Sequence, residues 1–142
     1  MGVAEAMQAA GQVLVGQANF ESGKYTRSVM YANAKNQEAD TQMEVERLRD
    51  AARLAMGRQV VSLSSGGLDF DGSALDAVRE SAIESQLEIM QTRRKGALAA
   101  ESYRVQGRTA YAAGYNSMIQ SHVGAAKELA ESRADYAAAK RA

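Results

Sequence analysis

The 142-residue chain contains no proline, no cysteine and no tryptophan, and it has a single histidine. Without proline, nothing in the sequence forces a helix to break. Without cysteine, disulfide bonds, thiolate metal sites and thiol catalysis are excluded. Aromatic residues make up only 6% of the chain, whereas alanine occurs 28 times. Because alanine favours helix but buries little area, we expect strong local helicity and a thin hydrophobic core.

Long apolar runs and a net charge are lacking as well. No stretch reaches the roughly 18 consecutive apolar residues that a membrane-spanning helix needs. Lys and Arg together number 17, and so do Asp and Glu. This balance does not favour an overall attraction to DNA or to an anionic membrane. Since a thin core gives one copy little packing energy, we expect further copies of the chain to supply the missing burial.

One cluster of turn-forming residues, SLSSGGLDFDGS at residues 62–73, interrupts a sequence that otherwise favours helix. The predicted fold is therefore all-α: a long antiparallel helical hairpin with helices over 24–61 and 74–140, joined by this Ser/Gly/Asp-rich turn. Ser73, followed three residues later by Asp76, resembles a capping box at the start of the second helix. Residues 1–23 form an N-terminal arm of small residues, and a frayed helix, a flexible arm and a close-packing segment all remain open for it.

Apolar residues recur at spacings of three and four in both predicted helices, as expected of a contact face. In the first helix this stripe consists of Val45, Leu48, Ala52, Met56 and Val60, extended toward the N-terminus by Tyr31 and Ala34. In the second helix it consists of Leu75, Val78, Ala82, Ile83, Leu87, Met90, Ala97 and Leu98. We expect the two stripes to pack against each other.

Charged side chains alternate in sign along the two arms in a complementary way. If paired residue numbers add to about 135, basic residues of one arm face acidic residues of the other, in exposed pairs that select register more than they stabilise. The side chains predicted to set register and assembly are Arg47, Arg53, Arg58, Glu80, Glu84, Glu88, Arg93, Arg94 and Lys95. Glu38, Asp40 and Glu44 are the expected partners of the last three.

Glycines inside the second predicted helix are expected to mark close helix contact, because each costs about 1 kcal/mol relative to alanine. The residues predicted to pack closely are Gly96, Tyr103, Gly107, Tyr111 and Gly114. Packing against a neighbouring helix is the expected role of Tyr103, Tyr111 and Tyr115, and base stacking is the alternative.

No arrangement of residues indicates catalysis, so we do not expect an enzyme, a cofactor or a metal. Asp69, Asp71, Ser73 and Glu80 have part of the spacing of a calcium loop, but the sixth place holds Ala74 instead of glycine. A turn and a helix start explain these residues better. His122 has no nucleophile or carboxylate pair beside it in the sequence, and we expect it at a helix surface or an interface.

Three segments resemble the internal virion proteins of short-tailed, podovirus-type phages. These segments are the SSGGLD loop at 64–69, the GSALDAV stretch at 72–78, and YRVQG at 103–107, preceded by Arg93 or Arg94. The resemblance covers roughly residues 30–115. It implies a non-enzymatic structural protein of the virion core or neck, ejected with or ahead of the genome. Such proteins resemble components of a conduit across the host outer membrane, while peptidoglycan cleavage belongs to larger partner proteins.

The function expected from sequence is therefore assembly. The chain would form a homo-oligomeric ring or tube, located in the virion and then in the host envelope. Its expected partners are further copies, the portal or other core and ejection proteins, and the host outer membrane, with genome DNA in non-specific passage. Two alternatives remain: a head–tail adaptor that stays in the particle, and a DNA-packaging protein that binds phosphates through Arg93, Arg94, Lys95, Arg104 and Arg108.

Overall fold

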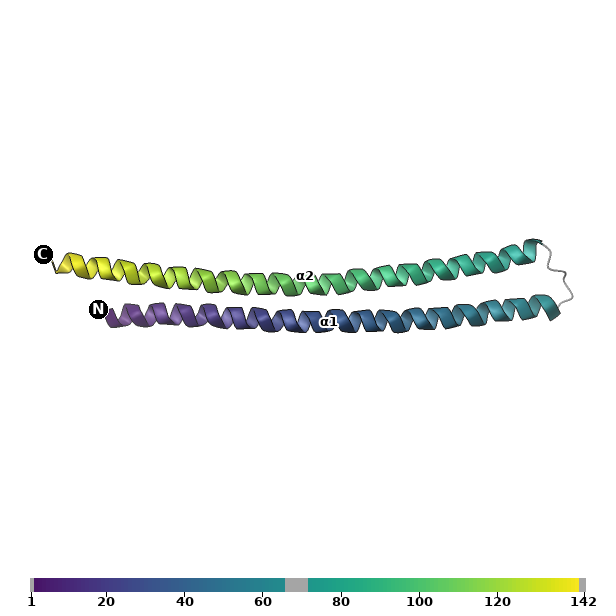
Figure 1. Ribbon diagram of the computed structural model, residues 1–142, viewed down its shortest axis with the longest axis horizontal. Coiled ribbons are helices and arrows are strands. Elements are labelled where there is room, and N and C mark those ends of the chain that lie inside the picture. The colour runs from purple at the N-terminus through teal and green to yellow at the C-terminus, as the bar shows by residue number, and fades with distance from the viewer. Residues whose placement is uncertain (1, 66–71, 141–142) are drawn as a thin grey trace. The chain divides into compact units, whose positions relative to one another are not determined.

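The computed structural model describes residues 2–65 and 72–140, which form two α-helices. Helix α1 spans Gly2–Ser65 and α2 spans Gly72–Ala139 (Figure 1). After α2, the backbone N–H of Lys140 donates a hydrogen bond of 3.2 Å to the carbonyl of Tyr136. The predicted all-α class, with two helices packed against each other and no strand among the described residues, is confirmed.

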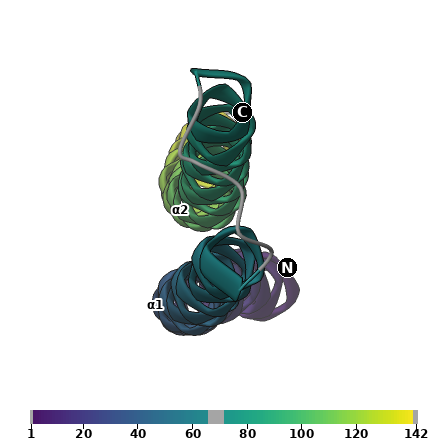
Figure 2. The same cartoon turned by 90° about the vertical axis from the view of Figure 1, so that its right-hand side faces the viewer.

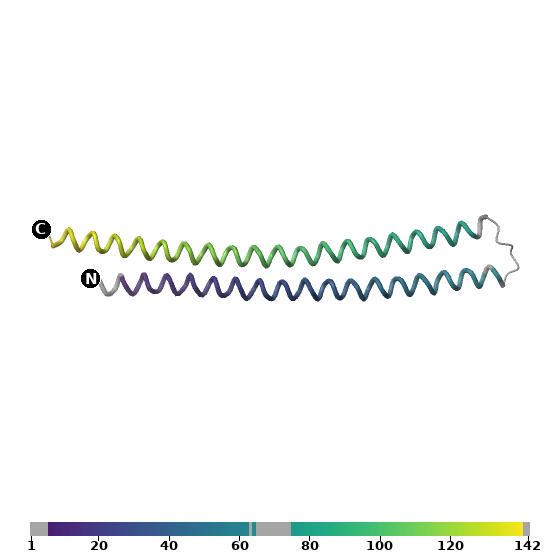
Figure 3. Tube along the Cα trace, in the orientation of Figure 1, coloured from purple at the N-terminus to yellow at the C-terminus, as the bar shows by residue number. Residues whose placement is uncertain are grey.

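The helices are longer than the sequence pattern predicts. α1 continues to Ser65 and α2 begins at Gly72. Residues at both ends of the predicted turn, 62–65 and 72–73, are therefore helical. The backbone of Ser73 lies within α2, and its predicted capping role stays a prediction. At the other end, residues 2–23 belong to α1, and Figure 3 traces the helix as a continuous coil through residues 6–23. The absence of proline allows this continuity, and alanine and glutamine favour it.

The chain divides into two units. Unit 1 comprises Met1–Ala32 and Tyr103–Ala142, and unit 2 comprises Asn33–Ser102. Each unit holds one segment of α1 and one segment of α2. Figure 2 shows the two helices from one end. Unit 1 contains eight Lys and Arg against five Asp and Glu, whereas unit 2 contains nine against twelve. The neutral chain thus combines a unit of formal charge +3 with a unit of formal charge −3.

The contact between the helices is built mainly from small side chains. In unit 1 the buried residues are Ala9, Gly16, Gly23, Gly107, Gly114 and Ala125, and in unit 2 they are Ala34, Val45, Ile89, Gly96 and Ala100. Val45 and Ile89 are the only large apolar side chains among the buried described residues. Burying alanine and glycine removes little apolar area from water, so this core contributes little hydrophobic stabilisation.

Hydroxyl groups share the contact face because each is satisfied by its own helix. Thr41 Oγ1 donates to the Gln37 carbonyl at 2.6 Å, Ser85 Oγ to the Ser81 carbonyl at 2.8 Å, and Ser121 Oγ to the Ser117 carbonyl at 2.8 Å. A hydroxyl bonded four residues back needs no partner across the interface. Small polar residues can therefore occupy positions where the pattern analysis expects apolar ones.

The contact face of α1 largely follows the predicted stripe. Ala34 and Val45 are buried, Leu48, Ala52 and Met56 are half-buried, and Val60 and Tyr31 are more exposed.

The stripe predicted for α2 is wrong over much of its length. Ile83, Leu87, Met90 and Leu98 are all about half exposed or more. Val78 and Ala82 of the predicted stripe are half-buried, as expected. Beyond them the contact line leaves the prediction and continues through Ser85, Ile89, Thr92, Gly96 and Ala100, each of them buried or half-buried. Ranking residues by hydrophobicity missed this face because close approach of the helices requires small residues there.

Candidate functional site

The charged residues predicted to set the register bond locally or point to solvent. Arg47 pairs with Glu44 and Arg53 with Asp50, each at 3.6 Å and each within α1. These local pairs take the place of the cross-helix pairs expected for the two arginines. The other predicted register residues are exposed: Arg58, Glu80, Glu84, Glu88, Arg93, Arg94 and Lys95.

Small residues set the register instead. Gly16 lies against Ser121, Gly23 against Gly114, and Gly96 against Thr41, and in each pair the two residue numbers add to 137. The antiparallel register thus agrees with the one predicted from charge, but its physical cause differs. Close steric contact at these small residues excludes neighbouring alignments of the two helices.

In unit 1 the helices approach backbone to backbone. A Cβ placed on Gly114 would lie 2.7 Å from the carbonyl oxygen of Asn19 and 3.3 Å from the Cα of Gly23. A Cβ on Gly23 would lie 2.7 Å from the carbonyl oxygen of Ala110. Only glycine fits such a contact without moving a helix. Gly107 is likewise buried against α1, while Tyr103 and Tyr111 are half-buried.

Two polar bonds across unit 1 accompany this contact. Gln12 Nε2 donates to Glu128 Oε1 at 2.6 Å, and Asn19 Nδ2 donates to Ser117 Oγ at 2.9 Å. In unit 2, Gln59 Nε2 donates to Ser81 Oγ at 3.2 Å. Each unit thus has at least one side-chain hydrogen bond between α1 and α2.

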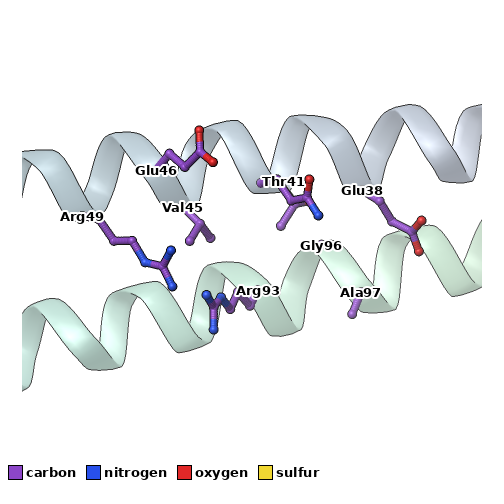
Figure 4. Close-up of a pocket in the computed structure, with 9 residues that line it drawn as sticks. Glu38, Thr41, Val45, Glu46, Arg49, Arg93, Gly96 and Ala97 are labelled. Atoms are coloured by element: carbon purple, nitrogen blue, oxygen red, sulfur yellow. The ribbon is translucent and has the colours of Figure 1, made fainter.

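Unit 2 contains an open groove of about 630 Å³ between α1 and α2 (Figure 4). Val45 and Gly96 are among the residues that line it, and Arg49 and Arg93 enter it from opposite helices. In Figure 4 the Arg49 side chain extends toward α2, while Glu46 points away from it. The groove mixes both charges and encloses no buried titratable group. The groove therefore does not suggest chemistry.

Aromatic and basic side chains form one connected cluster in unit 1. The Phe20 ring lies 5.6 Å from Tyr111 and 6.1 Å from Tyr115, measured between ring centroids, and the two tyrosine rings are stacked. Lys24 Nζ lies 5.3 Å from the Phe20 centroid. We call this cluster, together with Arg27, Tyr31 and Arg108, the aromatic–basic surface.

Arg27 joins the two halves of this surface. Its guanidinium carbon lies 5.5 Å from the Tyr31 ring and 5.0 Å from the Tyr111 ring, so it is held between α1 and α2 by two cation–π contacts. The hydrogen bond from Arg108 lowers the pKa of the Tyr31 phenol, and the positive charges of Arg108 and Arg27 act in the same direction. Partial burial of the ring opposes this shift, and the lowered pKa reflects the two arginines beside the phenol.

A second feature lies on the side of α2 that does not contact α1. In unit 1 its large members are Val105, Ile119 and Val123, which are 41–63% exposed. Ala112 and Ala126 continue the seven-residue spacing of Val105 and Ile119 and are also exposed. We call these five residues the outer α2 face. Their spacing is that of a helix side that packs against another helix.

The remaining predicted site residues gain no partners that would suggest chemistry. His122 is exposed. Of the calcium candidates, Asp69 and Asp71 lie outside the described residues, and the described part of the chain holds no group of three His, Asp or Glu residues that could bind a metal. Neither described helix contains a segment apolar enough to cross a membrane.

Comparisons with protein-family models, with curated proteins and with solved structures found no match to this chain. The sequence analysis missed the α1 half of the aromatic–basic surface. A usable signal was present, because Phe20, Lys24, Arg27 and Tyr31 recur at spacings of three and four and so share one side of a helix.

Proposed function

We propose that this chain is a structural protein that associates with copies of itself, and that the outer α2 face is part of the interface. One observation carries the proposal. Among the described residues, two large apolar side chains are buried, whereas twenty are exposed. An isolated pair of helices with this distribution leaves most of its hydrophobic stabilisation unused. Association with further helices would recover it.

A second copy is the partner that the chemistry favours. The outer α2 face is a narrow apolar line with a seven-residue spacing, which suits a helix with the same spacing. Beside the exposed apolar residues of α2 in unit 2 lie the acidic residues Glu80, Glu84 and Glu88, while unit 1 carries a net positive charge. Opposite charges on different regions of one chain favour contacts between unlike regions of neighbouring copies. Such contacts repeat, and they end in a closed ring when the rotation closes.

The finer role that we propose is that of a non-enzymatic virion protein of a short-tailed phage. Its support is the resemblance carried by the SSGGLD, GSALDAV and YRVQG segments. In that role the assembled chain lies in the virion core or neck, beside the portal or other core proteins, and helps to form a path for the genome across the host envelope. An adaptor that stays in the particle is the alternative. Dye release from liposomes by the purified assembly supports the conduit, and intact liposomes support the adaptor.

Self-association is tested by a charge on the outer α2 face. We expect Ile119→Glu to shift the protein to smaller species in light scattering, because the carboxylate would have to be desolvated in the interface. Gln120→Glu is the matched control, since it adds the same charge to the neighbouring residue on a different side of the helix. If both variants keep the mass of the unmodified protein, the outer α2 face is not part of the interface.

A further inference from the structure

The aromatic–basic surface has a composition unlike the rest of the chain. Six of the eight aromatic residues of the protein lie within residues 20–31 and 103–115. The same two segments contain four basic residues and one acidic residue, Glu21, which pairs with Lys24 at 3.1 Å. The neutrality of the whole chain conceals this local excess of positive charge.

From this arrangement we infer that the aromatic–basic surface is a binding site for single-stranded nucleic acid. Such a ligand presents phosphates and flat rings in alternation. Proteins bind it without sequence preference by combining basic side chains, which track the phosphates, with aromatic side chains on which bases stack. Lys24, Arg27 and Arg108 supply the first element, and Tyr31 and Tyr115 supply the second.

The geometry leaves both elements accessible. Tyr31 is 37% exposed and Tyr115 is 44% exposed, and the side chain of Lys24 is 49% exposed. Phe20 and Tyr111 are half-buried and hold the exposed rings in place through the contacts described above. From Phe20 to Tyr31 the surface extends about 16 Å along α1. This length suits a short run of nucleotides.

This site lies elsewhere than the phosphate-binding residues of the DNA-packaging alternative given in the sequence analysis. Arg93, Arg94 and Lys95 lie in unit 2, where acidic residues outnumber basic ones and where no stacked aromatic rings occur among the described residues. Only Arg108 belongs both to the residues of that alternative and to the aromatic–basic surface. An acidic peptide would satisfy the cations of the aromatic–basic surface but would leave its exposed rings without a planar partner.

The test is fluorescence anisotropy of a labelled oligothymidine mixed with the full-length protein at low salt. We expect binding that weakens as salt concentration rises, because phosphate contacts release counterions. Arg27→Gln and Tyr115→Leu should each lower the affinity about tenfold, since each removes one phosphate or stacking contact. Leucine keeps apolar volume at residue 115 while it removes the flat ring.

Two matched controls separate this site from general electrostatics. Arg47→Gln removes an exposed arginine from unit 2. Tyr136→Ala removes an exposed tyrosine outside the aromatic–basic surface. Both variants should bind oligothymidine as the unmodified protein does. Polyphosphate of equal charge should compete several-fold less well than unlabelled oligothymidine. Failure to bind at low salt, equal loss in the controls, or equal competition by polyphosphate would each overturn the assignment. Circular dichroism and light scattering show whether each variant keeps its helices and its mass.

Discussion

Units 1 and 2 use the same two helices but hold them together differently. In unit 1 the helices meet at Gly23 and Gly114, where backbone lies against backbone. In unit 2 large side chains, Val45 and Ile89, are buried, and Gly96 makes room for the Thr41 side chain. The first contact is rigid because a backbone cannot change rotamer, whereas the second can adjust. The comparison shows that small residues position the helices, while side-chain packing contributes more in only one unit.

The two units also differ in charge and in aromatic content. Unit 1 is basic and holds every aromatic residue of the chain except Phe70, whereas unit 2 is acidic and mainly aliphatic. Close backbone approach in unit 1 brings rings and guanidinium groups from both helices together at one surface. The specialised surface thus follows from the glycines beneath it.

The largest effect is expected from adding a methyl group between the backbones of unit 1. Gly114→Ala should lower the free energy of unfolding by about 1–3 kcal/mol, because the new Cβ would overlap the Asn19 carbonyl. Urea unfolding followed by circular dichroism at fixed protein concentration measures this loss. Gly57→Ala is the control, since nothing lies within 4 Å of that position, and we expect it to stabilise by about 0.5–1 kcal/mol. Equal effects of the two substitutions would contradict the close approach.

A smaller and reversible effect is expected in unit 2. Gly96→Ala should destabilise the protein by about 1 kcal/mol, because its Cβ would meet the Thr41 side chain. Thr41→Ala removes that side chain, so a double-mutant cycle should show a favourable coupling of about 0.5–3 kcal/mol. The corresponding cycle in unit 1, Gly114→Ala with Asn19→Ala, should show almost none, because the clash there is with backbone. A similar coupling in both units would remove the distinction between them.

The smallest effect concerns Tyr31. Its pKa should lie below the ordinary value of about 10, and Arg108→Gln should raise it, since the hydrogen bond from Arg108 is the main cause of the shift. NMR titration of the tyrosine ring carbons, with Tyr31 assigned through Tyr31→Phe, measures both values. Because the folded state favours the phenolate, the associated stability is absent at neutral pH. This stability appears as pH rises through the pKa of Tyr31 in the folded protein. It becomes constant above the ordinary tyrosine pKa of the unfolded chain. An unchanged pKa in Arg108→Gln would contradict the contact.

Helix content and helix number could be predicted from sequence because they depend on local features, whereas the register was predicted from charges although small residues set it. The absence of proline and the cluster at residues 62–73 suffice for the first two. The face of α2 could not be predicted in this way. Ile83, Leu87, Met90 and Leu98 form a regular apolar stripe, yet the helices meet through Ser85, Ile89, Gly96 and Ala100. An apolar pattern indicates that a face packs against something, but it does not say whether the partner is the other helix or another molecule.

The same limit explains the result for the charges. The charge pattern predicted ion pairs between the helices. Arg47 and Arg53 instead form ion pairs with carboxylates three residues away on their own helix. Residues three apart on one helix are neighbours whatever the helix packs against. Sequence spacing alone could not rank the two kinds of partner.

The most direct test of this account is the mass of the unmodified protein in solution. We expect a multiple of the 15.2 kDa chain mass, with one dominant size that electron microscopy shows as closed rings. A stable and monodisperse species of 15.2 kDa would show that the exposed apolar residues need no second copy, and it would contradict the central claim.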